Sequence, residues 1–343
     1  MKYVSIGGQA VMEGVMMKSA SSLAMSVRRA DGTIVVEKQK LTMKSWRKAV
    51  NKIPVVRGVV AFVDSLISGM NLTSQSAQMY GEDLLEGEEP TKFEKWLSKT
   101  FKIKLETVAI VLGIVLGLGL SFVLFMFLPS LVSTLISKIF GITVETATPL
   151  TKLLLNIAEG FTKILIFLGY LFAIGFMKDI KRLFMYHGAE HKVISCYEHG
   201  DELTVENARK YSTSHPRCGT SFMFIIMVVG ILIASIIDNL FGFNTLTMGA
   251  SIVRLLAKIL LLPVVAGTSY EILKLLAKSD NIFFRILRAP GMLLQKLSTR
   301  EPDDSMLEVS LVSFKTVLVM DGLMEEEVKT VDELNESNEN DSQ

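Results

Sequence analysis

Cysteine, histidine and net charge are all scarce in this 343-residue sequence. Only two cysteines occur, Cys196 and Cys218, which is too few for a disulfide framework and favours free thiols or metal ligands. The formal net charge is +1 at pH 7, so no basic excess is present and we expect no nucleic-acid partner. The first residues lack the charged head, apolar core and small-residue cleavage site of a signal peptide, and we expect none.

Hydrophobic residues, in contrast, make up 50% of the chain, and the mean hydropathy is +0.41. This excess is concentrated in a few long runs, which is typical of a membrane protein. The runs predict four transmembrane helices, at about 107–128, 153–177, 221–238 and 255–277. We therefore expect a mainly α-helical integral membrane protein.

The distribution of lysine and arginine predicts how these helices are oriented. Four spans place both termini on the same side of the membrane. Basic residues crowd the segment before the first span and the segment 178–220 between the second and the third. By the positive-inside rule, both termini and the segment 178–220 face the cytosol of a multi-pass protein of the cell membrane.

The residues before the first span predict a small β-containing segment and one further helix. Asp31-Gly32 stands between two extended runs, as in a β-hairpin. Residues 53–72 are nearly continuously apolar but contain Arg57 and Asp64. Because two charges are costly in hydrocarbon, we expect an amphipathic helix on the membrane surface rather than a fifth span.

The residues after the last span mix basic and apolar side chains and then become acidic and polar. The mixed part predicts amphipathic helices at the cytosolic surface, and the tail predicts disorder. The expected domains are an N-terminal cytosolic segment (1–106) and a four-span membrane domain (107–277). They are followed by cytosolic amphipathic helices (278–322) and an acidic tail (323–343).

All four histidines lie in the segment 178–220. Two of them, His187 and His191, are four residues apart, and Glu190 lies between them. On a helix these three side chains share one face. The order His-x-x-Glu-His is the inverted zincin pattern, in which the histidines hold zinc and the glutamate acts on water. We therefore expect a divalent metal, with zinc preferred, and Glu190 as a general base.

Three models remain open for the donors around this motif. A catalytic site would take one of His215, Cys218 or Glu206 as third ligand and keep one position free. A structural site would close with His187, His191, His215 and Cys218. In a third model no metal binds, and the histidines are hydrogen-bonded interface residues.

Three further polar residues are weaker candidates for a functional role. Arg217 could stabilise an anionic substrate or pair with a nearby acid. Glu13, in an apolar setting, could be a remote ligand or acid, although a paired or solvated carboxylate is the plainer interpretation. His199, beside Gly200-Asp201, is expected to be exposed to solvent.

Four motifs resemble the YqhQ-type family of bacterial multi-pass membrane proteins, which are described as predicted metal-dependent enzymes without an assigned reaction. They are Gly7–Met17, Tyr186–Lys192, His215–Thr220 and Thr299–Asp304. One departure is Ser298, where the family pattern has a second threonine. The resemblance implies that the histidine motif and the His215–Thr220 motif form the metal region, and it implies no substrate.

The sequence thus predicts an integral membrane zinc hydrolase that acts at the cytosolic surface of the bilayer. The expected substrate is lipid-linked or a membrane-bound peptide, and a homo-oligomer is compatible with the sequence. The alternative is a non-catalytic membrane scaffold or transport-related protein with a structural zinc.

Overall fold

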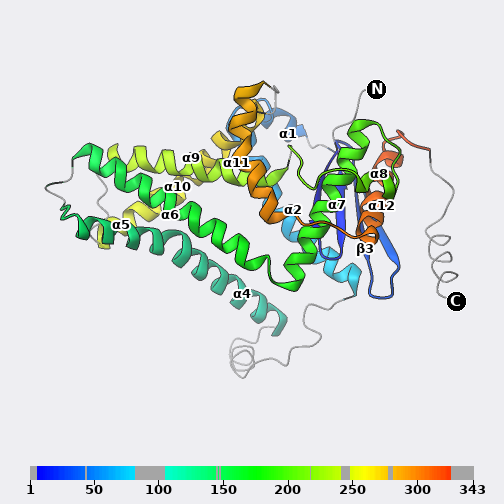
Figure 1. The fold of residues 1–343 in the computed structure, drawn as a ribbon, viewed down its shortest axis with the longest axis horizontal. Coiled ribbons are helices and arrows are strands. Elements are labelled where there is room, and N and C mark those ends of the chain that lie inside the picture. The colour runs from blue at the N-terminus through cyan, green and yellow to red at the C-terminus, as the bar shows by residue number, and fades with distance from the viewer. Residues whose placement is uncertain are drawn as a thin grey trace. The chain divides into compact units, whose positions relative to one another are not determined.

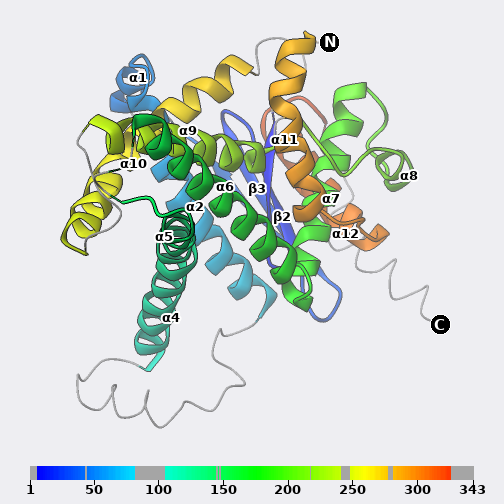
Figure 2. The ribbon, with the colours of Figure 1, turned by 60° about the vertical axis from the view of Figure 1, so that its left-hand side comes forward.

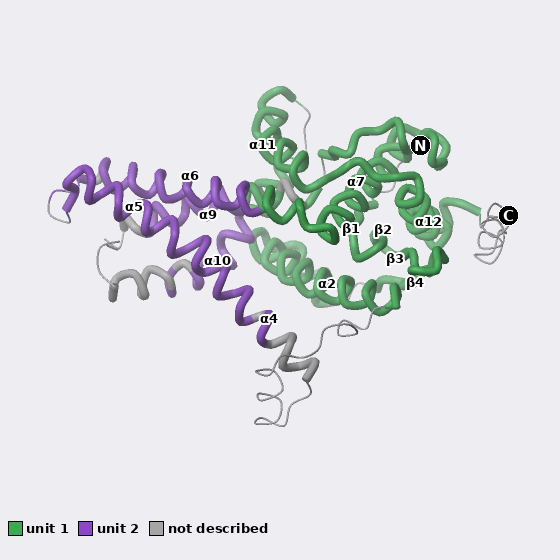
Figure 3. The backbone as a smooth tube through the Cα atoms, turned by 60° about the horizontal axis from the view of Figure 1, so that its bottom comes forward, with its two compact units in different colours: residues 1–83, 171–225, 269–343 green, residues 84–170, 226–268 purple. Residues whose placement is uncertain are grey.

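The computed structural model describes residues 6–42, 45–81, 105–143, 146, 148–216, 218–240, 248–276 and 281–325. The chain divides into two compact units, shown in Figure 3. The first unit combines Met1–Asp83, Leu171–Ile225 and Ser269–Gln343, and the second combines Leu84–Tyr170 with Ile226–Thr268. Residues 82–104, Arg217 and the part of the expected tail from 326 onward lie outside the described residues. Residues 81–104 are expected from the sequence to form a charged connector.

The first unit contains a four-stranded antiparallel sheet in the order β1-β2-β3-β4 (Figure 1). The strands are β1 Gly7–Val11, β2 Gly14–Lys18, β3 Ser22–Arg28 and β4 Ile34–Lys40. The predicted hairpin is confirmed as β3 and β4, with Gly32 at a φ of 88° in the turn. The first two strands were not predicted, because their glycines were interpreted as breaks.

Both faces of this sheet are covered by helices (Figure 2). Side chains alternate along a strand, so Val15 and Met17 of β2 pack in one cluster with helices α7 (Lys178–His199) and α12 (Asp304–Met320). Met16, between them, packs in a second cluster with Leu72 of helix α2 (Val56–Tyr80). The apolar run in β2 is therefore explained by burial on both sides.

Helix α2 corresponds to the predicted surface helix at 53–72 and continues further, to Tyr80. Its two charged residues are paired within the first unit. Arg57 binds the carboxylate of Glu271, and Asp64 accepts a hydrogen bond from Arg47 at 2.7 Å. Among the described residues, α2 is not one of the helices apolar enough to cross a membrane.

Three more helices complete the polar part of the first unit: α1 Ser45–Val50, α8 Val205–Arg209 and α11 Ile282–Ser298. The short helix α8 begins as expected at Thr204, whose hydroxyl accepts the backbone N–H of Asn207. Helix α12 lies within the range expected to form cytosolic amphipathic helices, but it is part of the core. Most of its apolar side chains, including Phe314 and Val317, are buried in the cluster that it shares with the sheet and α7.

The remaining helices are long and apolar, and they are α4 Leu105–Phe122, α5 Leu128–Ile139, α6 Pro149–Ile174, α9 Gly219–Leu240 and α10 Met248–Leu276. A π-helical turn, Val123–Phe127, joins α4 to α5, so the first apolar helix does not end near 128 as predicted. Pro129 directly follows this turn, and a proline that lacks its N–H is a common cause of such an irregularity in a continuous helix.

Among the described residues, three helices are long and apolar enough to cross a membrane. They are Val115–Ile139, Leu150–Ile174 and Ile259–Leu276. The predicted span at 221–238 coincides with a shorter apolar helix, Phe222–Ile237. A fourth crossing and the cytosolic orientation stay predictions.

Candidate metal centre

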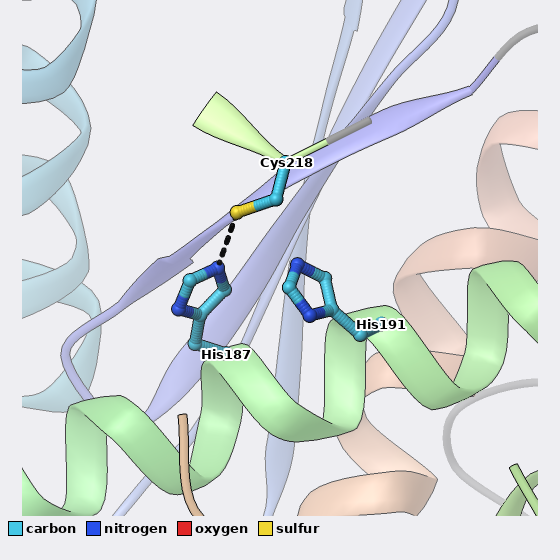
Figure 4. Close-up of side chains that lie close together, drawn as sticks. All are labelled: His187, His191 and Cys218. Carbon is cyan, nitrogen blue, oxygen red and sulfur yellow. Dashed lines mark hydrogen bonds between the residues drawn. The ribbon is translucent and has the colours of Figure 1, made fainter. Parts of the chain in front are cut away.

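Helix α7 presents the two histidines of the motif on one side (Figure 4). The centroids of the His187 and His191 rings lie 4.4 Å apart. Cys218 comes from the segment that returns to α7 before α9, and its Sγ lies 3.2 Å from Nε2 of His187. One donor atom from each of the three residues lies within 4.8 Å of the others. This group could hold a metal ion.

Hydrogen bonds orient both imidazole rings for such a role. Nδ1–H of His187 donates to the backbone carbonyl of Ser298 at 2.9 Å, and Nδ1–H of His191 donates to that of Thr213 at 2.5 Å. A carbonyl can only accept, so each Nδ1 carries a proton, and in the neutral form of the ring the lone pair is on Nε2. Backbone carbonyls commonly fix metal-binding histidines in this way. Position 298 is a serine where the family pattern has threonine, but this contact uses the main-chain oxygen and does not depend on that side chain.

The donor set also fits zinc by its chemistry and its size. Zinc accepts imidazole nitrogen at about 2.0–2.1 Å and thiolate sulfur at about 2.3 Å, so tetrahedral donors are roughly 3.3–3.6 Å apart. His191 and Cys218 are buried, with 1% and 9% of their surfaces exposed, and His187 is half-buried. Small side-chain movements would be enough to close a three-ligand shell.

The other predicted ligands are not in this group. Nε2 of His215 lies 3.2 Å from a carboxylate oxygen of Glu198, and its ring centroid is 5.8 Å from that of His191. The backbone of His215 is held by a reciprocal pair of hydrogen bonds with the Gln295 amide, at 2.8 and 2.9 Å. Glu206 is exposed on α8. Among the described residues, Cys218 is thus the third donor.

Glu190 lies on the same helix but is buried against strand β1, with 5% of its surface exposed. Burial raises the pKa of Glu190 to about 7, although the nearby His187 ring and the backbone N–H of Gly8 act in the opposite direction. A Cβ on Gly8 would meet Cγ of Glu190 at 2.8 Å. The glycine in the N-terminal motif is therefore required by the approach of Glu190, a contact that no sequence spacing indicates.

Glu13 does not act as a remote ligand. It stands in the turn between β1 and β2 at a φ of 49°, and its carboxylate accepts hydrogen bonds from both Nε and a terminal nitrogen of Arg182. The Tyr186 hydroxyl also donates to it at 3.3 Å, and burial raises the pKa of that tyrosine. The plainer interpretation, a paired carboxylate, is confirmed, and the pair ties the N-terminal turn to α7.

Two contacts that the sequence did not reveal hold chain segments against α7. Nζ of Lys192 is almost fully buried and donates to the carbonyls of Arg209 and Tyr211, at 2.9 and 2.7 Å. On another turn, a Cβ on Gly188 would meet the carbonyl oxygen of Arg300 at 2.1 Å. Only glycine allows the chain after α11 to cross α7 at this distance.

The remaining candidates in the polar segment have structural contacts. His199 is exposed as expected, and its Nδ1–H donates to the Ser195 carbonyl at 2.7 Å. Cys196 is fully buried, and burial raises the pKa of its thiol to about 11. Its Sγ–H donates to the carbonyl of Glu202 at 3.4 Å. Cys196 is therefore a core residue and not a ligand.

The comparisons with known proteins agree on one family. A family model described as "Protein of unknown function (DUF1385)" matches residues 53–320. The chain is 34% identical over 325 residues to "Uncharacterized protein YqhQ" of Bacillus subtilis (strain 168), which covers 94% of this chain and 95% of the relative. No solved structure matches the chain. This chain therefore belongs to the YqhQ-type family, DUF1385.

Proposed function

We propose that this protein is a membrane-embedded, metal-dependent hydrolase with zinc held by His187, His191 and Cys218. The observation that carries the proposal is the orientation of the two rings. Each Nδ1–H is engaged by a backbone carbonyl, which leaves each Nε2 available beside Sγ of Cys218. Two imidazole nitrogens and one thiol sulfur are a zinc-type donor set.

Three protein donors leave a fourth zinc position for water or substrate, as in catalytic sites. When bound, the metal supplies a Lewis acid and lowers the pKa of coordinated water. Glu190, three residues after His187 on α7, would be the general base that takes a proton from water. Its pKa near 7 suits that role, because a base works best when its pKa is close to the working pH.

The apolar helices support a site beside a bilayer, and the substrate proposed is lipid-linked or a membrane-bound peptide at the cytosolic surface. Arg217, the proposed anion-stabilising residue, lies outside the described residues. It directly precedes Cys218 in the sequence. Its role as a catalytic residue stays part of the proposal.

A structural zinc in a scaffold or transport-related protein is the second candidate. The burial of His191 and Cys218 favours it, because structural sites are closed to solvent. In this case zinc would join the returning segment before α9 to α7, and Glu190 would only fill space beside Gly8.

Metal analysis of the purified protein tests the donor set. We expect about one zinc per chain in the wild type and a loss of zinc in His187→Ala, His191→Ala and Cys218→Ala. His199→Ala is the matched control, because that histidine is exposed and lies outside the group. Retention of full zinc by Cys218→Ala would contradict the three-donor site.

A second experiment separates the enzyme from the scaffold. Glu190→Gln keeps the size of the side chain and removes the base, so we expect a normal zinc content together with the lipid profile of cells that lack the protein. The matched control is Glu206→Gln, which changes an exposed glutamate of α8. Cells with Glu190→Gln that have the wild-type lipid and membrane-peptide profile would favour the scaffold.

A further inference from the structure

A cavity of about 740 Å³ opens beside helix α11, in the first unit. Its walls come from two segments, and they include Ser214 and Pro216 on one side and Arg285, Arg288, Met292 and Lys296 on the other. The volume lies within the range of small-molecule sites, roughly 300–1,000 Å³. The cavity is large enough for a phospholipid head group.

The charge of this cavity has one sign. Arg285, Arg288 and Lys296 follow one another along the same face of α11, and none of the described lining residues is acidic. Three cations around one space attract an anion, and guanidinium groups bind phosphate oxygens in a bidentate manner. The electrostatics therefore favour a ligand that contains phosphate.

An apolar stripe runs beside these cations on the same helix. Ile282, Ile286 and Leu293 are exposed by 69%, 63% and 60%, and their spacing places them on one face. The opposite face of α11, with Gly291 and Leu294, is buried. Exposed apolar residues next to basic residues on one helix are typical of a surface helix at an anionic membrane.

We propose that this basic cavity binds the phosphate head group of an anionic membrane lipid, while the apolar stripe of α11 contacts its acyl chains. The juxtaposition of three cations in a cavity with an exposed apolar stripe on the same helix favours an amphiphile over a soluble anion. A soluble phosphate would use the cations and leave the stripe without a function.

This lipid site is distinct from the proposed zinc site, although the two have neighbouring walls. Pro216 lines the cavity and Cys218 carries the third donor, while Gln295, beside Lys296, holds the backbone of His215. A lipid phosphate in the cavity would therefore lie on the side of α11 that positions the returning segment. The lipid proposal needs no metal, and it is tested with a chelator present.

The test measures binding of three probes to the full chain in a mild detergent, by isothermal titration calorimetry. The probes are dioctanoyl phosphatidic acid, dioctanoyl phosphatidylcholine and inorganic phosphate. The test variant changes Arg285, Arg288 and Lys296 to glutamine. The matched control changes three exposed lysines elsewhere, Lys38, Lys40 and Lys52, to glutamine, so that both variants lose the same charge.

We expect wild type and control to bind phosphatidic acid equally, and the triple variant to bind it at least about tenfold more weakly, because charge-assisted hydrogen bonds are lost. Arg285 and Lys296 are exposed, so folding should survive. If the triple variant loses helical content, Arg285→Gln alone is used, with a several-fold weakening expected. Equal binding by wild type and variant, equal affinity for phosphatidylcholine, or inorganic phosphate bound as tightly as the lipid would each overturn the proposal.

Discussion

Gly8 and Glu190 are 182 positions apart in the sequence and touch in the fold: a Cβ on Gly8 would lie 2.8 Å from Cγ of Glu190. The same Cβ would meet the carbonyl oxygen of Met16 and Sδ of Met17, also at 2.8 Å. The proposed general base is thus held by the first strand of the sheet. The N-terminal motif and the histidine motif act as one structural unit.

The first prediction concerns Gly8→Ala. A methyl group there cannot be accommodated by moving side chains alone, because the Met16 carbonyl belongs to the backbone of the paired strand. We expect a destabilisation of about 1–3 kcal/mol and a fall of a few degrees in Tm. Gly7→Ala is the control, because nothing lies within 4 Å of its Cβ. Equal Tm values for the two variants would contradict the close contact.

The second prediction concerns the buried Lys192. Its ion pair with Glu301, at 2.6 Å, contributes little because the Glu301 side chain is 68% exposed. The carbonyls of Arg209 and Tyr211, in contrast, would lose their donor in Lys192→Met. We expect a cost of about 2–4 kcal/mol, measured by thermal unfolding in detergent. Lys181→Met, which changes an exposed lysine of α7, should leave Tm unchanged.

The sequence predicted the parts of this fold that depend on neighbouring residues. His187 and His191 share a face because a helix has a fixed period, and Thr204 caps α8 through a contact three residues away. The hairpin at Gly32 is likewise local. The helix at 53–72 was likewise indicated by the apolar and charged residues of one segment.

The sequence could not predict contacts that depend on distant segments. His215 was a candidate ligand by type, but the Gln295 amide holds its backbone and Glu198 faces its ring. Strands β1 and β2 were not predicted because glycines such as Gly8 weaken a strand pattern. The reason for Gly8 is the close approach of Glu190, which lies far away in the sequence. The sequence also did not show that the sheet and α7 would bury most of the apolar side chains of α12. In each case the deciding partner lies more than fifteen residues away.

The third prediction is a pH dependence of stability that comes from His215. Burial lowers the pKa of His215 from 6.5 to about 4, and a proton on the neighbouring His191 ring would act in the same direction. Between pH 6.5 and 4, the unfolded chain therefore binds a proton at this position and the folded chain does not. The free energy of unfolding falls as pH decreases through this window, by up to about 3 kcal/mol.

Comparison of the wild type with His215→Gln isolates this contribution. We expect the variant to lose less stability than the wild type between pH 6.5 and 4, as measured by chemical unfolding in detergent. A chelator is present throughout, because acid-driven release of metal would give the same direction. His199→Gln, at an exposed position, should lose as much stability with falling pH as the wild type. If the free energy of unfolding of His215→Gln also falls in parallel with that of the wild type, His215 is not buried in a neutral form.

The last prediction concerns the membrane topology, for which α9 is decisive. Its apolar part, Phe222–Ile237, is shorter than the three other candidate spans, yet an extra crossing there is needed to return the C-terminus to the cytosol. We expect a fluorescent protein fused after Gln343 to be fluorescent, and alkaline phosphatase fused at Thr148 to be active, because the phosphatase folds only outside the cytosol. A phosphatase fused at His199 should be inactive, since the basic residues around α7 keep this segment inside. If the fluorescent protein after Gln343 is dark and alkaline phosphatase fused at the same place is active, α9 does not cross, and the proposed cytosolic location of α11 and its basic cavity is wrong.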